Sequence, residues 1–250
     1  MPRTVAATRY VAPLRQGGSL PALVEADDDG LYVVKLRGAG QGPRALVSEL
    51  VAGGLGAALG LPVPELVLVD LDPHLADAEP DPEIQELLQA SAGLNAGLDF
   101  LPGALPYLPG GALALDPAQA AAVVWLDALT ENIDRTARNT NLLVWHGRLW
   151  LIDHGAALYR QHAGLDPAQA GGAFEAIADH VLLPCAGSIS DADARLAPVV
   201  DRELLTGLLA GVPEDWLMGT PRQAYVDYLA ARLEPPRAWV AQAEEARTGG

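Results

Sequence analysis

The chain has 250 residues, of which half are hydrophobic and 19% are charged, so it can fold around a sizeable core. Its formal net charge of −16 argues against binding to nucleic acid or to anionic membrane surfaces, because both need a basic footprint. Cys185 is the only cysteine, which excludes an internal disulfide, and no apolar run is long enough for a transmembrane helix. We therefore expect a cytoplasmic globular protein without nucleic-acid or membrane partners.

The first hundred residues predict mainly β-strands. Asp27-Asp28-Asp29-Gly30 is typical of a hairpin turn, since Asp-Gly supplies the positive φ that such turns need. One helix is expected at 44–59, where Gly60-Leu61-Pro62 ends it. The predicted strands are the apolar or β-branched runs 10–14, 20–26, 31–36 and 65–71.

The remainder of the chain predicts mainly helices. An acidic, proline-rich loop is expected at 72–82, and the apolar run 98–103 predicts a strand that ends at the boundary between two lobes. Asp116-Pro117 is typical of a helix start, with a capping residue followed by proline in the first turn. The predicted helices are 83–92, 116–130, 169–183, 201–209 and 222–233.

Lys35 is the one lysine among 16 basic residues, the other 15 being arginines. The abundance of Ala, Gly, Pro and Arg suggests a coding bias that replaces lysine wherever a positive charge is sufficient. A lysine that remains in such a sequence points to a site that needs a compact ammonium rather than a planar guanidinium. Lys35 lies in the predicted strand 31–36, and Glu49 on the following helix is placed to pair with it.

A two-stranded hairpin interrupts the helical part of the chain. Residues 141–145 and 148–152 are short apolar strands joined by His146-Gly147, which suits a two-residue turn. Hairpin pairing brings the start of the first strand beside the end of the second. The sequence therefore predicts that Asn139 and Asp153 lie next to each other, with Asp134 on the loop that leads into the hairpin.

These polar residues are the types that phosphoryl transfer requires. One carboxylate orients the attacking hydroxyl and accepts its proton, while an amide oxygen and a second carboxylate hold magnesium against the nucleotide phosphates. The spacing from Asp134 to Asn139 is that of the kinase catalytic loop, and Asp153-His154-Gly155 has the spacing of the kinase magnesium motif. Asp and Asn are also common in ordinary loops, so the interpretation depends on the ordered combination with Lys35.

With this combination the chain resembles the protein-kinase-like fold, and within it the HipA-like kinases and, more distantly, the phosphoinositide kinases. The resemblance covers roughly residues 10 to 190. It implies an α+β fold with a β-rich nucleotide-binding lobe at 1–101, which has one main helix, and a helical catalytic lobe at 102–250. The phrases that carry it are Gly60-Leu61-Pro62-Val63-Pro64-Glu65, Asn132-Ile133-Asp134-Arg135 and Leu151-Ile152-Asp153-His154-Gly155.

The resemblance also implies that the protein uses ATP and Mg²⁺. Lys35 would contact the α- and β-phosphates of ATP, and Glu49 would hold Lys35 in place. Asp134 would be the catalytic base that orients the acceptor hydroxyl. Asn139 and Asp153 would be the ligands of Mg²⁺.

By the same likeness Gly17, Gly18 and Ser19 would cover the phosphates with backbone amides, although Gly-Gly-Ser is also common in ordinary turns. Two features depart from the regulated eukaryotic kinases. Asn132-Ile133 stands where those kinases have His-Arg before the catalytic aspartate, and His154 replaces the usual Phe. We therefore do not expect activation-loop switching of the eukaryotic type.

The catalytic residues do not specify what they phosphorylate. The HipA likeness implies a serine or threonine of a protein, and a small-molecule or lipid hydroxyl is the alternative. A pseudokinase without turnover usually lacks one of the site residues, whereas Lys35, Asp134, Asn139 and Asp153 are all present. A metal-dependent phosphohydrolase would need clustered His and carboxylate ligands, and the five histidines show no metal-ligand spacing. The oligomeric state is not indicated.

Overall fold

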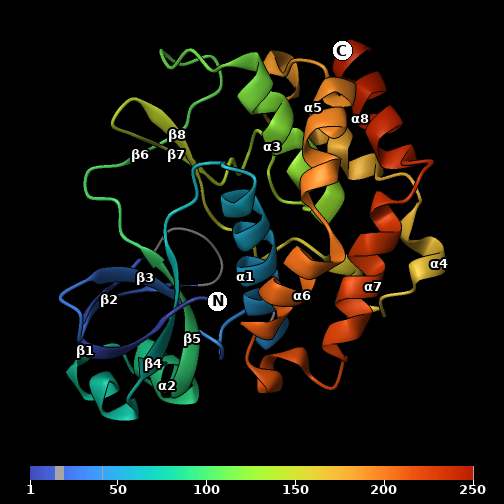
Figure 1. The fold of residues 1–250 in the computed structure, drawn as a ribbon. Coiled ribbons are helices and arrows are strands. Elements are labelled where there is room, and N and C mark those ends of the chain that lie inside the picture. Colours follow the sequence, from blue (N-terminus) through green and yellow to red (C-terminus); the bar gives the residue numbers. More distant parts are fainter. Residues whose placement is uncertain (15–19, 41, 250) are drawn as a thin grey trace.

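The computed structural model describes residues 1–14, 20–40 and 42–249. Strands gather in the first hundred residues and helices make up most of the remainder, which confirms the predicted α+β class (Figure 1). Helix α1 (Pro43–Ala58) lies between the strand-rich part and the helices of the C-terminal part (Figure 1). This helix therefore carries side chains that can reach both parts.

Five strands close into a barrel. Their order around it is β1-β2-β3-β5-β4, and all neighbours are antiparallel except β1 and β4, which are parallel. The predicted turn between the second and third strands is present, with Asp29 at a φ of 61°. The strands are β1 (Thr4–Pro13), β2 (Ala22–Ala26), β3 (Leu31–Lys35), β4 (Leu66–Leu71) and β5 (Gly93–Asp99).

Strand β5 begins earlier than the predicted segment 98–103. Its glycines weaken the strand signal in the sequence, but its backbone pairs with both β3 and β4. Gly97 is needed for close packing, because a Cβ atom there would lie 2.6 Å from a methyl group of Val69. Tertiary pairing rather than local propensity therefore makes this segment a strand.

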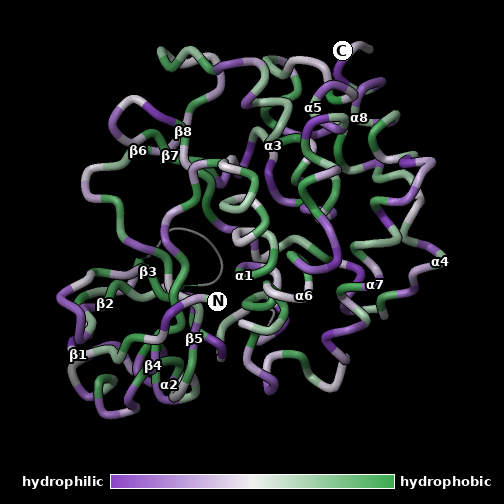
Figure 2. The backbone as a smooth tube through the Cα atoms, viewed as in Figure 1, coloured by the Kyte–Doolittle hydropathy of each residue, from purple (hydrophilic) through white to green (hydrophobic). Residues whose placement is uncertain are grey.

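Helix α1 is buried along most of its length. Proline stands in its first turn, and it ends at Ala58, one residue before the predicted end and shortly before Gly60, which has a φ of 75°. The hydrophobic colouring along α1 and the barrel strands in Figure 2 contrasts with the hydrophilic outer turns. Two polar residues, Ser48 and Glu49, are nevertheless fully buried in this helix. Buried polar groups of this kind need partners, and both have them at the site described below.

The predicted hairpin is present in the helical part. Strands β7 (Leu142–Trp145) and β8 (Arg148–Leu151) are antiparallel, with Leu142 opposite Leu151. His146 and Gly147 have φ values of 49° and 71°, as a type I′ turn requires. The two-residue strand β6 (Leu105–Pro106) pairs with β7 and makes a third strand of this small sheet.

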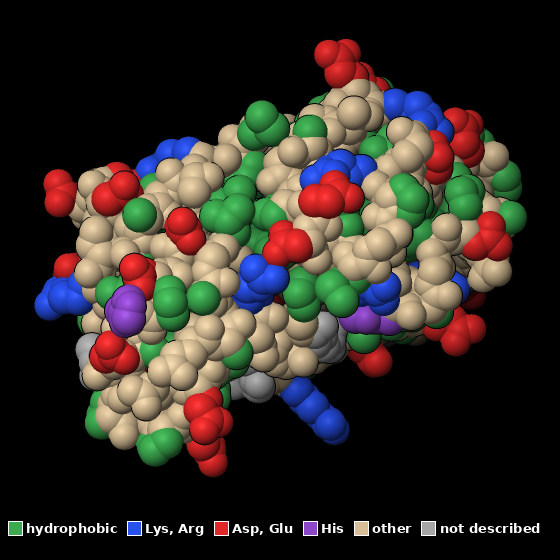
Figure 3. Space-filling view, turned by 90° about the horizontal axis from the view of Figure 1, so that it is seen from below, with side chains coloured by type: hydrophobic (Ala, Val, Ile, Leu, Met, Phe, Trp, Pro, Cys, Tyr) green, Lys and Arg blue, Asp and Glu red, His purple; other side chains and the backbone are tan. Residues whose placement is uncertain are grey.

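The helices pack around α3 (Pro117–Thr130), whose residues from Ala120 to Thr130 are all buried. In the described residues, none of the helices is both long and apolar enough to cross a membrane. On the face shown in Figure 3, basic side chains lie singly among acidic ones. The remaining helices are α2 (Pro82–Ala90), α4 (Pro167–Ala170), α5 (Ile189–Leu196), α6 (Arg202–Ala210), α7 (Arg222–Leu233) and α8 (Ala238–Thr248).

The predicted helix 169–183 is wrong. Helix α4 ends at Ala170, and the chain continues through 3-10 turns at Glu175–Asp179 and Leu183–Cys185. The glycine pair Gly171-Gly172 disfavours continuation of a helix because glycine has a large backbone entropy to lose. Helices α5 and α8 were not predicted, whereas α6 and α7 agree with the predicted segments.

Candidate active site

Lys35 and Glu49 form an ion pair between the barrel and helix α1. Lys35 is the last residue of β3, and Glu49 lies on the buried side of α1. Lys35 Nζ is 2.7 Å from Glu49 Oε2, and the glutamate side chain is fully buried while that of the lysine is 12% exposed. The structure thus brings together the two residues that the sequence paired.

Opposing effects set the charge of this pair. Burial alone would raise the pKa of Glu49, but Lys35 and the hydrogen bonds from His154 lower it to about 2. Burial alone would lower the pKa of Lys35, but the charges of Glu49 and Asp153 raise it above its ordinary value. The site therefore holds a fixed ammonium at neutral pH.

Asp153 is the second partner of the same ammonium. It follows β8 in the left-handed region, with a φ of 54°, and its Oδ1 accepts a hydrogen bond from Lys35 Nζ. Its side chain is 40% exposed, in contrast to the buried Glu49. The backbone N–H of His154 donates to Glu49 Oε2 at 2.8 Å, which ties the segment after Asp153 to α1. Glu49 thus anchors the lysine, while Asp153 presents a carboxylate to solvent.

Asp134 lies on the loop before the hairpin and is held by three asparagines. Asn139 Nδ2 donates to Asp134 Oδ2 at 2.8 Å, and Asn141 Nδ2 donates to the backbone oxygen of Asp134 at 3.1 Å. Asn132 Oδ1 accepts from the backbone N–H of Asp134 at 3.2 Å. These contacts orient the carboxylate. Because Asn139 uses its amide nitrogen here, its carbonyl oxygen is the atom able to bind a cation.

Asn139 and Asp153 are less directly paired than the hairpin geometry predicted. In the part of the chain that the structure describes, none of the hydrogen bonds joins the two residues. The residue across from the end of β8 is Asn141, whose backbone oxygen accepts from Ile152 N at 3.1 Å. Sequence reasoning missed Asn141 as a site residue. Its position as the last polar residue before the apolar strand β7 was the available signal.

A buried polar network lies behind the loop, and sequence reasoning missed it as well. Asp127 on α3 accepts from Arg135 Nε at 2.5 Å and contacts His180 Nε2 at 2.9 Å, and its side chain is fully buried. Burial alone would raise the pKa of Asp127, but Arg135 and His180 lower it. Burial lowers the pKa of His180. The signal in the sequence was Asp127 itself, a lone acidic residue inside an apolar helix.

A chain of hydrogen bonds fixes α1 against the segment after Asp153. Ser48 Oγ donates to the backbone oxygen of Ala157 at 2.6 Å, and Gln161 Nε2 donates to Ser48 Oγ at 2.7 Å. Tyr225 on α7 donates to Gln161 Oε1 at 3.0 Å. All three side chains are buried, so the helix that carries Glu49 is held from its far side.

Oxygen donors that suit a magnesium ion are present at the site. Asp153 is a partly exposed carboxylate, and Asn139 is an exposed amide beside Asp134. Carboxylate and amide oxygens are hard ligands of the kind that Mg²⁺ takes, usually together with substrate phosphates and water. Among the described residues, no group of three or more His, Cys, Asp or Glu side chains could hold a metal ion. The donor set therefore fits a cation that is shared with phosphates.

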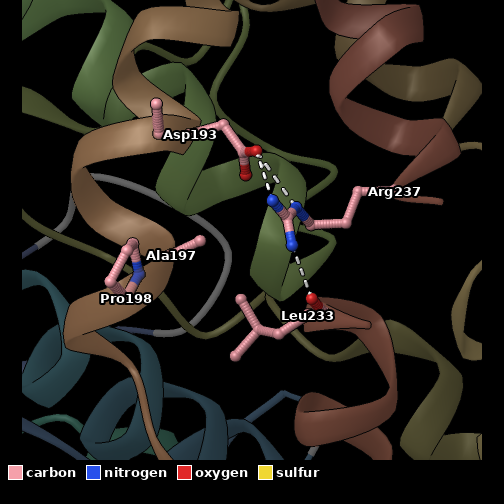
Figure 4. Close-up of a pocket in the computed structure, with 6 residues that line it drawn as sticks. Asp193, Ala197, Pro198, Leu233 and Arg237 are labelled. Atoms are coloured by element: carbon pink, nitrogen blue, oxygen red, sulfur yellow. Dashed lines mark hydrogen bonds and ion pairs between the residues drawn. The ribbon is translucent and has the colours of Figure 1, made fainter. Parts of the chain in front are cut away.

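Gly17, Gly18 and Ser19 lie outside the described residues. A hollow of about 250 Å³ lies beside α5 and the end of α7. Arg237, which lines it, pairs with Asp193 at 2.7 Å (Figure 4). A second hollow, of about 450 Å³, lies at the end of α1 and includes Leu59 and Leu61. Neither hollow is lined by residues of the candidate site.

Comparison with known proteins identifies relatives of this arrangement. A family model described as HipA-like kinase matches residues 8–234. The crystal structure of the Helicobacter pylori proinflammatory kinase CtkA is similar at 14% identity and a TM-score of 0.53, covering 95% of this chain and 94% of that one. A Golgi casein kinase structure with Mn/ADP bound is similar at 13% identity and a TM-score of 0.52, covering 98% and 74%.

A comparison with curated proteins found no match. At such low identity the structural likenesses show the fold alone, which is that of a kinase. The family match supports a relationship of sequence as well as of fold, since it spans both the barrel and most of the helical part. This chain belongs to the HipA-like kinase family.

Proposed function

We propose that this protein is an ATP- and magnesium-dependent kinase that transfers the γ-phosphate of ATP to a serine or threonine hydroxyl of a protein. Lys35, held by Glu49, contacts the phosphates, and Asp134 is the catalytic base. Asn139 and Asp153 are the magnesium ligands. The two lobes of this kinase domain are residues 1–101 and 102–250.

One observation carries the proposal: the ammonium of Lys35 donates to both Glu49 and Asp153. These three residues come from the barrel, from α1 and from the end of the hairpin. An ammonium has three donor hydrogens, so it can serve a phosphate oxygen beside its two carboxylates. A cation next to an exposed carboxylate is the arrangement needed where phosphates and their metal are bound together.

The reaction follows from the roles of these side chains. Asn139 and Asp153 would hold magnesium, which would supply positive charge beside the transferring phosphate, and Lys35 would donate hydrogen bonds to the phosphate oxygens. Asp134, oriented by Asn139 and Asn141, accepts the proton of the acceptor hydroxyl as its oxygen attacks the γ-phosphorus. The bond between the γ-phosphorus and the β–γ bridging oxygen breaks, and ADP leaves. Gly17, Gly18 and Ser19 are proposed to cover the phosphates with backbone amides.

Support for nucleotide and metal comes from the donor set and from a relative. Asp153 and Asn139 supply oxygen ligands, and the similar Golgi casein kinase was solved with Mn/ADP bound. The choice of a protein serine or threonine rests on the HipA likeness. A small-molecule or lipid hydroxyl would use the same catalytic residues.

The test is to incubate the pure protein with γ-labelled ATP and magnesium and to locate the label. Acceptors are the protein itself, a mixture of dephosphorylated proteins, small polyols and lipid vesicles, and Asp134→Ala is the negative control. Label on serine or threonine supports the proposal, while label on a polyol or lipid reassigns the acceptor. Label released only as inorganic phosphate contradicts kinase activity, and no turnover together with ATP binding identifies a pseudokinase.

A further inference from the structure

Arg135 directly follows Asp134, but its side chain is buried while Asp134 is partly exposed. The guanidinium lies at the open end of the hairpin. Its Nη1 donates to the backbone oxygen of Asn141, at the start of β7, and to the backbone oxygen of Ile152 at 3.2 Å, at the end of β8. The carbonyl group of Ile152 belongs to the peptide bond that leads into Asp153.

The same guanidinium is anchored to α3 on its other side. Arg135 Nε donates to Asp127 Oδ2, and Asn132 Nδ2 donates to Asp127 Oδ1 at 3.0 Å. His180 contacts Oδ2 through Nε2 and accepts from Leu182 N at Nδ1, at 3.1 Å, so its Nε2 carries the hydrogen. Asp127 is therefore a fixed anion in the core, and it fixes the position of Arg135.

The backbone of Arg135 is held as firmly as its side chain. Its carbonyl oxygen accepts from Val181 N at 3.0 Å, and Thr136 forms an isolated β-bridge with His180. Arg135 therefore connects the loop of Asp134, both ends of the hairpin and α3. Arg135 thus adjoins Asp134 in the chain and binds the peptide group that precedes Asp153.

We propose that Arg135 is a positioning residue that sets the placement of the base Asp134 relative to the metal ligand Asp153, an inference that rests on the proposed kinase function. A planar guanidinium can donate to Asp127 and to two carbonyl oxygens at once, in fixed directions. An ammonium at the same place keeps the charge next to Asp127 but cannot span the three acceptors. Arg135→Lys therefore separates the charge from the geometry.

A purely structural role is the competing explanation, because removing one partner of a buried ion pair is destabilising wherever it lies. The chain offers a matched control in Arg232. Its side chain is 1% exposed, it pairs with the buried Glu131 at 3.3 Å, and it donates to the backbone oxygens of Ala128 and Leu129 on α3. Arg232, on α7, is thus a buried arginine that pairs with a buried carboxylate and donates to α3, as Arg135 does, but it does not contact the hairpin strands.

The experiment compares wild type, Arg135→Lys and Arg232→Lys. Melting temperature is measured first, then ATP affinity by calorimetry over a magnesium titration, then the rate of labelled γ-phosphate transfer. Both variants are expected to melt below wild type. Arg135→Lys alone is expected to need at least about tenfold more magnesium for half-maximal ATP binding. It alone is also expected to lose about 10²-fold in kcat, the usual consequence of misplaced catalytic groups.

The outcomes separate the two levels of the proposal. If wild type transfers phosphate and Arg135→Lys has the magnesium requirement and kcat of Arg232→Lys, the positioning role is wrong while the kinase function stands. If wild type neither binds magnesium-ATP nor transfers phosphate, both proposals are overturned. Should Arg135→Lys fail to fold, His180→Ala takes its place, because it removes a hydrogen bond that holds Asp127, the partner of Arg135. A wild-type magnesium requirement in that variant would then contradict the inference.

Discussion

Lys35 and Asp153 are 118 residues apart in the sequence, yet the ammonium of the first donates a hydrogen bond to the carboxylate of the second. The contact joins the barrel to the hairpin of the helical part. Glu49 holds the same ammonium from helix α1 at 2.7 Å. A cation and an exposed anion are thereby fixed side by side, as a site for phosphates and their metal requires.

Replacing Lys35 by arginine tests whether the ammonium itself matters. Lys35→Arg is expected to lower phosphate transfer by about 10²-fold, as for loss of a preorganised donor, although the charge is kept. A planar guanidinium is wider than the ammonium that Glu49 and Asp153 hold. Initial rates at saturating magnesium-ATP measure the effect.

Arg37→Lys is the control. Arg37 lies two residues from Lys35 and pairs with Asp215 at 2.8 Å. The transfer rate of this variant should match that of wild type. Equal rates for Lys35→Arg and wild type would contradict the role.

Asp134 and Asp153 are expected to fail in different ways. Asp134→Ala should keep magnesium-ATP binding near wild type while transfer falls by about 10² to 10⁴-fold, the scale for a lost general base. Asp153→Asn should lose both, because a charged magnesium ligand is removed. The measurements are calorimetric affinity and single-turnover transfer. A rise in melting temperature with magnesium-ATP should appear in wild type and Asp134→Ala but not in Asp153→Asn. Loss of binding in Asp134→Ala would argue that this residue is a metal ligand instead.

The two asparagines beside Asp134 can be distinguished by their magnesium dependence. Asn139→Ala should raise the magnesium concentration for half-maximal activity by about tenfold or more, because an oxygen ligand is lost. Asn141→Ala should leave that concentration near wild type and lower kcat by about tenfold. The Asn141 side chain donates to both the backbone oxygen and the carboxylate of Asp134 and so orients the base. Magnesium titrations of the transfer rate provide the comparison. The reverse pattern would move the ligand role to Asn141.

The buried His180 predicts a pH dependence of stability. Burial lowers its pKa in the folded protein, whereas the unfolded chain has the ordinary value near 6.5. As the pH falls below about 6.5 the unfolded state binds a proton that the folded state does not. The free energy of unfolding of wild type therefore falls by up to about 1.4 kcal/mol per pH unit. The neighbouring Asp127 has a lowered pKa and adds no pH dependence of stability above about pH 5.

Urea unfolding at pH 7.5 and pH 5.5 measures this effect. His180→Gln is expected to lose less stability between the two pH values than wild type, whatever its starting stability. His74→Gln serves as the control, because the side chain of His74 is 87% exposed. It should follow wild type. An unchanged pH dependence in His180→Gln would show that His180 does not carry the effect.

The parts of the site that could be predicted depend on local chemistry. His146-Gly147 determines the turn of the hairpin, and the lone lysine in a β-branched strand with a glutamate on the next helix indicated the ion pair. The family resemblance assigned Lys35 and Asp153 to the same nucleotide site, but their direct contact was not predicted. The kinase-like fold followed from the same motifs.

The parts that could not be predicted depend on packing between distant segments. Asp127 and His180 are 53 residues apart, and nothing in either local sequence shows that they meet. The segment after Asp153 was predicted as a long helix at 169–183, but its glycines and its contacts with α3 and α8 favour short 3-10 turns. Asn141 was read only as the first strand residue, because its role depends on the loop that folds back onto it.

The hydrogen-bonded chain from Ser48 through Gln161 to Tyr225 has a consequence for control. Swinging α1 outward, and with it Glu49, would break buried hydrogen bonds at 2.6, 2.7 and 3.0 Å. Between Asn141 and Gly187 the sequence contains no serine or threonine. Autophosphorylation of such a residue therefore cannot switch the conformation of the segment that follows Asp153. We expect the protein to be competent as soon as it folds, with its output limited by its abundance and by encounters with its acceptor.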